Sequence, residues 1–492
     1  MAARRRRSRR AFLKVAALGV SAPAWALRPA AAGAGAKRRP SFLLVISDDQ
    51  GGQMGCLGTK GLATPHMDAL AGQGVLFRQA FCTFGSCSPA RASMLTGLYP
   101  HAHGITANVH EHLGPRPPAN WPAGRRRHNA FYRVPSGAPT LIELLKKAGY
   151  RTGITSKFHL SPHEKFPFDQ WIKGNGGEDV ARFIEGCDDR PFFLVHNIRS
   201  PHRPFGGFIG RARRKIVDPR RVRVPAYLPD TPMMRRDWAQ YLTCIEITDA
   251  KLGEAMAALK ASGRAGEAVV WYTGDNGPAF HRGKYSVYDF GLRVPLIAAG
   301  PGIRRGLATD ALVSHVDLMP TVADLAGIDL PRPLHGRSLR ALLEGRPDPA
   351  AAKVIFGEVA FGHGPESAQG RSASDGRLHY IRRIRPDRPH KMPADNFQEK
   401  PWGNRSYRAT IEAAKAFPLA RRLLAQVEGT EPVEELFDLA RDPWCMRDVL
   451  NDPAYAAGLA RLRAEMDRWI RQTNDRAFLS KAPAGGSKEI RT

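Results

Sequence analysis

Short apolar runs alternate with amphipathic helical patterns along residues 40–330. The runs are continuous, which is typical of strands buried on both faces of a sheet. They lie at residues 41–47, 151–156, 192–198, 268–273 and 294–299. The helical patterns lie at residues 64–71, 88–97, 140–148, 235–260 and 317–326, and several are followed by a glycine that can end a helix. This order predicts an α/β fold, with a large domain over 40–330 whose mostly parallel central sheet is flanked by helices.

The pattern changes beyond the last of these helices. Short strand-like pieces at residues 354–359 and 378–383 precede a final helical pattern at 453–472. We therefore expect a smaller C-terminal α+β domain over residues 331–480. The last residues, 481–492, are polar and rich in glycine and lysine, so a disordered tail is expected there.

Two stretches are rich in proline, arginine and histidine, namely residues 114–139 and 201–232. Neither shows a clear apolar period. Both are predicted to be long loops, and loops of that length in a compact enzyme usually shape a binding site.

The first 36 residues have the features of an export signal. The sequence SRRAFLK at residues 8–14 contains a twin arginine, and the apolar run that follows at 15–27 is too short to span a bilayer. Residues 24–26 (AWA) offer a small-residue cleavage site. Residues 1–36 are therefore predicted to be a twin-arginine signal and linker, with a periplasmic or secreted protein as the product. A basic arm that binds nucleic acid is disfavoured, because such an arm has no need of the apolar run.

The charge balance is strongly basic. The chain has 74 Lys and Arg against 46 Asp and Glu, a net charge of +28, and removal of residues 1–26 would take away seven basic residues and leave +21. Such a surface attracts polyanions, whether sulfated sugars, nucleic acid or anionic lipid. A general abundance of arginine explains the charge equally well, so the charge does not choose a partner.

The six cysteines are widely spaced and include no C-x-x-C pair. They are at positions 56, 82, 87, 187, 244 and 445. This spacing argues against a zinc site and against a dense disulfide framework, although one or two disulfides are compatible with it.

Polar residues follow four of the predicted strands. In chain order they are Asp48 and Asp49, Lys157 and His159, His202, and Asp275 and Asn276. Ligands in open α/β sheets bind beyond the carboxyl ends of the strands, so these residues are expected to converge on one edge of the sheet. The acidic and amide side chains supply only oxygen ligands, which suits Ca²⁺ or Mg²⁺ better than zinc. A single Asp pair could instead be a helix cap or a turn.

Basic side chains accompany this acidic group. Arg91, Lys157, His159, His202 and Lys284 would together form a pocket for a tetrahedral oxyanion. Ser88 and Pro89 are predicted to be the N-cap and first residue of a helix, which would place Cys87 at a helix N-terminus where anions are favoured.

The stretch CSPARASMLTG at residues 87–97 resembles the signature of the sulfatase family. The motifs DD-x-G at 48–51, K-x-H at 157–159, P-H at 201–202 and D-N-G at 275–277 extend the resemblance over residues 40–453. It implies an alkaline phosphatase-like fold and a formylglycine made from Cys87 before export. A formylglycine-generating enzyme would read the proline and arginine of the motif.

The resemblance also implies a role for each site residue. One Ca²⁺ would be held by Asp48, Asp49, Asp275, Asn276 and an oxygen of the modified residue 87. Arg91 would hold the formylglycine diol, one hydroxyl of which attacks sulfur to give a covalent sulfated intermediate. Lys157, Lys284 and His202 would bind the sulfate oxygens, and His202 or Lys284 would protonate the leaving group. His159 would assist as the second hydroxyl collapses to the aldehyde and expels sulfate.

Several stretches are more similar to one branch, the heparan N-sulfatases (N-sulfoglucosamine sulfohydrolases). Among them are RTGITSKFHLSPHEKFPFD at 151–169 and LFDLARDPWCMRDVLNDP at 436–453. Lys284, where that branch would carry arginine, and Ser156, in place of a common glycine, depart from its pattern. The branch implies hydrolysis of sulfate esters or sulfamates on a sulfated sugar, read by the loops at 114–139 and 390–398.

Other functions are compatible with the same residues to different degrees. An arylsulfatase or a phosphonate or phosphate monoester hydrolase could use the same site. A non-catalytic polyanion-binding protein is disfavoured because Cys87, the acidic residues and Lys157 are all present. No nucleic-acid partner and no transmembrane segment are expected, and the oligomeric state is left open.

Overall fold

The computed structural model describes residues 38–331, 334–360, 369–384, 386, 405–428 and 431–479. The predicted export signal at 1–36, the predicted loop at 390–398 and the predicted tail at 481–492 lie outside the described residues. Among the described helices, none combines the length and the apolarity that crossing a bilayer requires.

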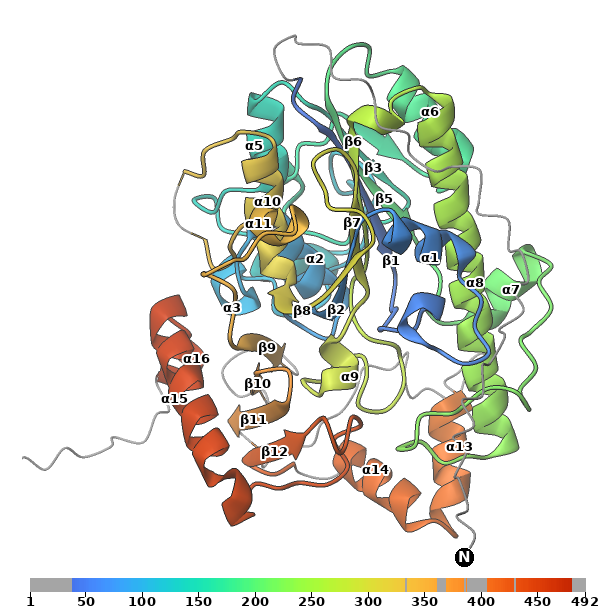
Figure 1. Cartoon of the computed structure of the whole chain (residues 1–492), viewed down its shortest axis with the longest axis vertical. Coiled ribbons are helices and arrows are strands. Elements are labelled where there is room, and N and C mark those ends of the chain that lie inside the picture. Colours follow the sequence, from blue (N-terminus) through green and yellow to red (C-terminus); the bar gives the residue numbers. More distant parts are fainter. Residues whose placement is uncertain are drawn as a thin grey trace, which may run out of the picture.

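A mostly parallel eight-stranded sheet forms the centre of the molecule (Figure 1). Its strands, in spatial order, are β4 (Gln170–Ile172), β3 (Arg151–Thr155), β5 (Phe192–Ile198), β1 (Ser41–Ser47), β6 (Ala268–Gly274), β7 (Leu296–Ala299), β2 (Val75–Phe81) and β8 (Leu307–Ser314). Strand β7 runs antiparallel to both of its neighbours, and the other pairings are parallel. The predicted fold class is confirmed.

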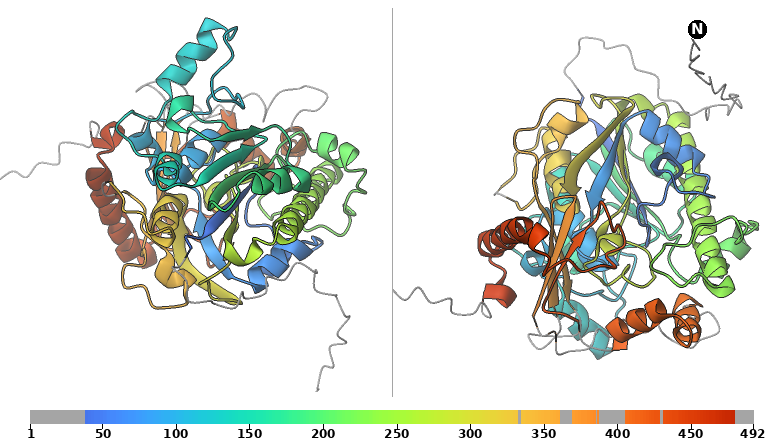
Figure 2. Two further views of the ribbon diagram at one scale, coloured as in Figure 1. Left: turned by 90° about the horizontal axis from the view of Figure 1, so that it is seen from above. Right: turned by 60° about the horizontal axis from the view of Figure 1, so that its bottom comes forward.

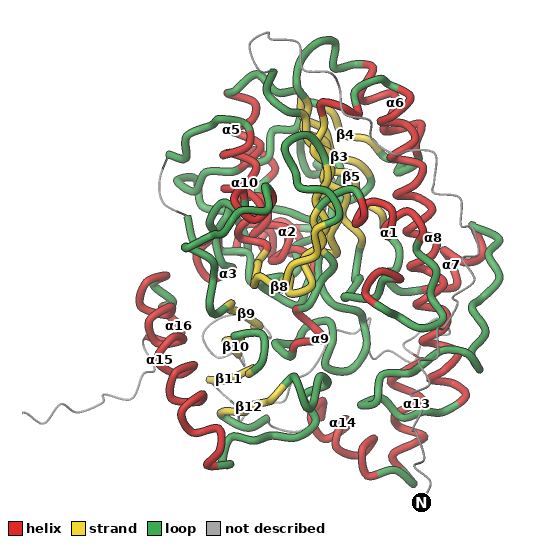
Figure 3. Tube along the Cα trace, in the orientation of Figure 1, coloured by secondary structure: helices red, strands yellow, loops and turns green. Residues whose placement is uncertain are grey.

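Helices cover both faces of this sheet (Figure 3). One face carries α1 (Pro65–Gly72), α6 (Gly177–Glu185) and α8 (Pro232–Ala261), and the other carries α2 (Cys87–Thr96), α5 (Leu141–Lys147) and α10 (Leu318–Leu325). Strand β1 is buried along its whole length, with Leu43 in the core under α8 and Leu44 in the core under α5. Successive side chains of a strand point to opposite faces, so a strand between two helical layers must be apolar throughout.

A separate four-stranded antiparallel sheet lies near the C-terminus, as expected. Its order is β12 (Glu434–Asp438), β11 (Leu378–Ile384), β10 (Gln369–Ser374) and β9 (Ile355–Ala360). Helix α15 (Ala456–Thr473) packs against this sheet through Leu462, Met466 and Trp469. Ile355 and Val359 of β9 belong to the core of the large sheet, so the two sheets share apolar contacts. The predicted domain boundary at residue 330 stays a prediction.

The remaining helices are short or peripheral. They are α3 (Pro100–His103), α4 (Ala123–Phe131), α7 (Phe205–Arg211), α9 (Asp289–Leu292), α11 (Arg340–Leu343), α13 (Arg405–Ala414), α14 (Pro418–Glu428) and α16 (Arg476–Leu479), with 3-10 turns at Gly55–Leu57, His163–Lys165, Ala265–Glu267, His315–Asp317 and Pro453–Tyr455.

Both predicted long loops contain a helix, so the prediction of continuous loop was wrong. The stretch at 114–139 forms α4, which protrudes from the body of the molecule (Figure 2, left), and the stretch at 201–232 forms α7. Helix α4 has no proline within it, and seven of its nine residues are exposed. A helix with so little buried surface has no strong apolar period, which is the signal that sequence reasoning depends on.

Candidate active site

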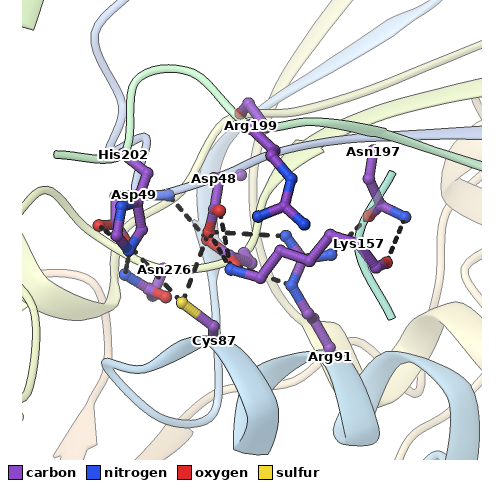
Figure 4. A network of polar contacts seen from close by, with 12 residues as sticks. Asp48, Asp49, Cys87, Arg91, Lys157, Asn197, Arg199, His202 and Asn276 are labelled. Carbon is purple, nitrogen blue, oxygen red and sulfur yellow. Dashed lines mark hydrogen bonds and ion pairs between the residues drawn. The ribbon is translucent and has the colours of Figure 1, made fainter. Parts of the chain in front are cut away.

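The predicted site residues meet at the carboxyl ends of β1, β3, β5 and β6 (Figure 4). Asp48 and Asp49 come directly after β1, Lys157 and His159 follow β3, His202 follows β5, and Asp275 and Asn276 follow β6. Cys87 and Arg91 reach the same place from α2, and Lys284 reaches it from the loop before α9. The convergence that was expected from the strand ends is therefore present in the structure.

Helix α2 begins at Cys87 itself, two residues before the predicted first residue, Pro89. Its N-cap is Ser86, so the assignment of Ser88 as N-cap and Pro89 as first residue was wrong. The Ser88 hydroxyl does not cap the helix, because it accepts a hydrogen bond from the main-chain N–H of Val109 at 3.2 Å. The N-terminal position of Cys87 is nevertheless as expected, and it directs the helix dipole at the acidic residues.

The thiol of Cys87 is buried among carboxylates. Its Sγ lies 3.5 Å from Oδ1 of Asp48 and 3.7 Å from Oδ1 of Asp49. Burial raises the pKa of this thiol well above its ordinary value, and the carboxylate of Asp275 adds to the effect. A thiol in this environment stays protonated, so unmodified Cys87 is a poor nucleophile.

Ligand atoms of Asp48, Asp49, Cys87 and Asp275 all lie within 4.8 Å of one another, and all four residues are buried. Asn276 completes the group, because its Nδ2 donates to Asp49 Oδ1 at 3.0 Å while its Oδ1 is buried without a hydrogen-bond partner among the described residues. Burial raises the pKa of Asp275 to about 6 despite the nearby Arg91 guanidinium. An unpaired amide oxygen beside three crowded carboxylates is the donor set of a hard cation such as Ca²⁺ or Mg²⁺. The residues present therefore fit the metal that sequence analysis expects.

Three cations balance the three carboxylates. Lys157 Nζ donates to both oxygens of Asp48 at 2.8 and 2.7 Å, and Lys284 Nζ lies 2.9 Å from Asp49 Oδ1. Burial raises the pKa of Asp48, but the surrounding cations, Lys157 first among them, together outweigh burial and hold this pKa well below its usual range. With the local charges cancelled in this way, a bound divalent cation would leave net positive charge at the site. That charge suits an anionic substrate.

Arg91 is fixed by three groups. Its Nε donates to Asp275 Oδ2 at 2.9 Å, its Nη1 donates to Asn197 Oδ1 at 2.5 Å, and its Nη2 lies 3.7 Å from Asp48 Oδ1. Within the part of the chain that the structure describes, Nη2 has no hydrogen-bond partner. One donor of a buried, fully charged guanidinium is thus left for another acceptor in the site.

The two histidines have different environments. His202 is partly exposed, and its Nε2 lies 3.7 Å from Asp49 Oδ2. His159 is half-buried, with its Nδ1 shielded from water, and desolvation together with the Lys157 ammonium holds its pKa well below the ordinary value. The sequence groups His159 with the cations, but its lowered pKa favours the neutral form of the ring.

Sequence reasoning missed Asn197, which lies inside the apolar strand β5. Its Oδ1 accepts from Arg91, and its Nδ2 donates to the main-chain oxygens of Thr155 and Lys157, both at 2.9 Å. A single buried amide therefore holds Arg91 and the end of β3 in register. The available signal was an asparagine one residue from the carboxyl end of a continuously apolar run.

Arg199 and Asn108 are two further residues that the sequence did not single out. Arg199 lies beside Asp48 and Lys157 in Figure 4 and bonds to Ser156 and Glu111. Asn108 accepts hydrogen bonds from the Ser86 hydroxyl at 2.9 Å and the Ser88 main-chain N–H at 3.0 Å. It thus fixes the first turn of α2 from outside the helix.

Comparison with known proteins gives a consistent result. A family model described as Sulfatase matches residues 40–182 and 178–328, more than half of the chain. N-sulphoglucosamine sulphohydrolase of Homo sapiens is 31% identical over 484 residues, with 89% of this chain and 91% of the relative covered.

Solved structures share the fold at lower identity. A 2-O GAG sulfatase superposes with a TM-score of 0.64 at 20% identity, covering 89% of this chain and 93% of that one. The phosphonate monoester hydrolase of Agrobacterium radiobacter superposes with a TM-score of 0.64 at 17% identity, covering 88% and 96%. The same architecture is thus found both in a protein named as a sulfatase and in one named as a phosphonate monoester hydrolase.

Proposed function

The chain belongs to the sulfatase family and is a sulfuric ester hydrolase, and we propose that it acts on a sulfated sugar of the N-sulfoglucosamine type. The observation that carries this proposal is the 31% identity to N-sulphoglucosamine sulphohydrolase across nearly the whole of both chains. The basic character of the chain, with a net charge of +28, supports an anionic substrate.

The acidic group is proposed to hold one Ca²⁺. Its ligands would be Asp48, Asp49, Asp275, the Oδ1 atom of Asn276 and an oxygen at residue 87. A bound Ca²⁺ would neutralise charge on the sulfate oxygens and polarise the sulfur centre. Oxygen donors favour this ion over zinc, which prefers nitrogen and sulfur.

Residue 87 is proposed to act as formylglycine. When formed, that group supplies a diol hydroxyl as the nucleophile, which the protonated thiol of Cys87 does not. Arg91 would orient this hydroxyl, because its free Nη2 donor belongs to a guanidinium that Asp275 and Asn197 hold in place. Residue 87 also lies at the N-terminus of α2, where the positive end of the helix dipole favours negative charge.

The remaining residues are proposed to bind the sulfate and move protons. Lys157 and Lys284 would donate to the sulfate oxygens from opposite sides of the acidic pair, since Lys157 approaches Asp48 and Lys284 approaches Asp49. His202, which is partly exposed, is placed to give a proton to the departing oxygen or nitrogen. His159 would assist as sulfate leaves, with its ring in the neutral form that the lowered pKa favours.

Export is proposed on the sequence alone. The twin arginine and short apolar run of residues 8–27 support the twin-arginine route to the periplasm or the exterior. A formylglycine-generating enzyme would then act on the chain before export.

A comparison of substrates tests the proposed function. Turnover is measured at fixed ionic strength on N-sulfated glucosamine, O-sulfated monosaccharides, a chromogenic aryl sulfate and a phosphonate monoester, with Cys87→Ala as the control. We expect the highest kcat/KM on a sulfated sugar and no turnover by Cys87→Ala. A clear preference for the aryl sulfate, with no release from any sugar, would contradict the sugar assignment. A preference for the phosphonate would contradict the assignment to sulfate.

A further inference from the structure

An ion pair between Arg199 and Glu111 lies at the edge of the active site, outside the groups that handle the sulfate. Arg199 Nη2 donates to Glu111 Oε1 at 2.5 Å, and Nη1 donates to Oε2 at 3.4 Å. The Arg199 side chain is 43% exposed and that of Glu111 is 26% exposed. The pair is therefore accessible to a ligand that enters the site.

Arg199 is held between two of the proposed sulfate-binding residues. Its main-chain oxygen accepts from the N–H of His202 at 3.1 Å. Its Nε donates to Ser156 Oγ at 3.1 Å and its Nη2 donates to Ser156 O at 2.8 Å. Because Ser156 directly precedes Lys157, these bonds anchor the guanidinium beside Lys157, and Figure 4 shows it directed toward Lys157 and Asp48.

Ser156 has a backbone conformation that serine seldom adopts. Its φ is +60°, in the left-handed region that favours glycine. Glycine would satisfy the turn without strain, but it would offer no hydroxyl to Arg199. The serine side chain thus gives Arg199 a fixed direction at some conformational cost, which is expected of a residue selected for positioning.

The guanidinium has spare capacity. Of its five N–H donors, Nε uses one, Nη2 uses two and Nη1 uses one in bonds to Ser156 and Glu111. One Nη1 donor therefore has no partner among the described residues, and the other donates to Glu111 at the long distance of 3.4 Å. An arginine fork in this state can bind a further anionic oxygen, and a partly exposed ion pair is weak enough to exchange partners.

We propose that Arg199 is a specificity-determining residue that binds a second anionic group, a sulfate or a carboxylate, on the same substrate. This inference rests on the proposed function, because it assumes that a sulfated sugar enters the site. Glu111 occupies the position in the free protein and opposes the second anion by its charge. Substrates with two anionic groups are thus favoured by Arg199 and restrained by Glu111.

The test measures binding in the Cys87→Ala background, where the ligand is not consumed. Calorimetry compares glucosamine N-sulfate with two ligands that carry a second anion, glucosamine-2-N,6-O-disulfate and an N-sulfated glucosamine joined to a uronic acid. We expect at least one of the latter two to bind more tightly than glucosamine N-sulfate. Arg199→Gln should reduce the ratio of affinities for the doubly and singly anionic ligands roughly tenfold, because a charge-assisted hydrogen bond to the second anion is lost. Glu111→Gln should increase this ratio, because the opposing carboxylate charge is removed.

Two variants separate recognition from structure. Ser156→Gly suits the left-handed backbone and removes the hydroxymethyl side chain, so it should lower the affinity ratio of the doubly anionic to the singly anionic ligand by less than Arg199→Gln does. Arg199→Lys keeps the charge but not the fork, and should retain part of the advantage. If the ratio of affinities is the same in Arg199→Gln as in the Cys87→Ala parent, the inference is overturned while the proposed function stands. If none of the three sugars binds, the proposed function fails and the inference fails with it.

Discussion

Replacing Asn197 with alanine should lower stability and catalysis together, because one amide supports two parts of the active site. Its oxygen accepts from Arg91 Nη1 at 2.5 Å, and its nitrogen donates to the main-chain oxygens of Thr155 and Lys157 at 2.9 Å. The residue is only 1% exposed, so water does not readily replace these bonds. Alanine would remove all three.

The size of the effect follows from the partners that are left unpaired. The Thr155 oxygen keeps a hydrogen bond from the N–H of Lys157, so its loss is small. The Lys157 oxygen loses the amide N–H, and the charged Arg91 loses one of its two hydrogen-bond acceptors. Unpaired buried groups cost about 1–3 kcal/mol each, with charged groups at the upper end, so we expect a loss of about 3–5 kcal/mol.

Urea unfolding and steady-state kinetics measure the two consequences. A suitable control is Asn129→Ala, because Asn129 is also a buried asparagine whose amide bonds to the N–H and C=O of His110, without a charged partner. Asn129→Ala should cost about 1–2 kcal/mol. In Asn197→Ala, kcat should also fall by about tenfold or more, because Arg91 is no longer held in one orientation. Equal losses of stability in the two variants, or an unchanged kcat in Asn197→Ala, would refute this reasoning.

Further predictions concern the metal and a titrating group outside the site. Asp275→Ala should purify with less than one calcium per chain and should not be rescued by zinc, which elemental analysis and activity assays would check; full activity with stoichiometric zinc would contradict it. Burial lowers the pKa of His101, but the Glu358 carboxylate at 2.6 Å raises it more, so the net pKa lies above the ordinary 6.5. The resulting stabilisation is fully present below pH 6.5 and is lost as the pH rises through the folded-state pKa. His101→Gln should remove this part of the pH dependence of urea unfolding, and an unchanged profile would exclude it.

The strands that sequence predicts best are those buried on both faces. The runs at 41–47 and 192–198 coincide with β1 and β5 in every residue, because an inner parallel strand must be apolar on both sides. Strands β2 and β8, which pair with each other, were not predicted. Each carries a charged residue at an exposed position, and these two residues, Arg78 and Asp310, form a salt bridge at 2.5 Å. The two charged residues interrupt the apolar pattern of both strands. That they form an ion pair is seen only once the strands are known to be neighbours.

The site was predictable where chemistry follows a strand end. Asp48, Lys157, His202 and Asp275 could be placed together because the carboxyl ends of parallel strands meet at one edge. Asn197 was not predictable, because its function depends on partners in α2 and β3 that are distant in sequence. Arg199 and Glu111 were missed for the same reason, since 88 residues separate them.

The central claim is that Cys87 is converted to an aldehyde, and mass spectrometry of one tryptic peptide tests it most directly. Cleavage after Arg78 and Arg91 releases residues 79–91, QAFCTFGSCSPAR, which contain both Cys82 and Cys87. Cys82 is an internal control, because it is equally buried but lies outside the C-x-P-x-R motif. We expect formylglycine at position 87 and an unmodified thiol at position 82 in the active, exported protein. A fully active protein with an unmodified cysteine at position 87 would contradict it.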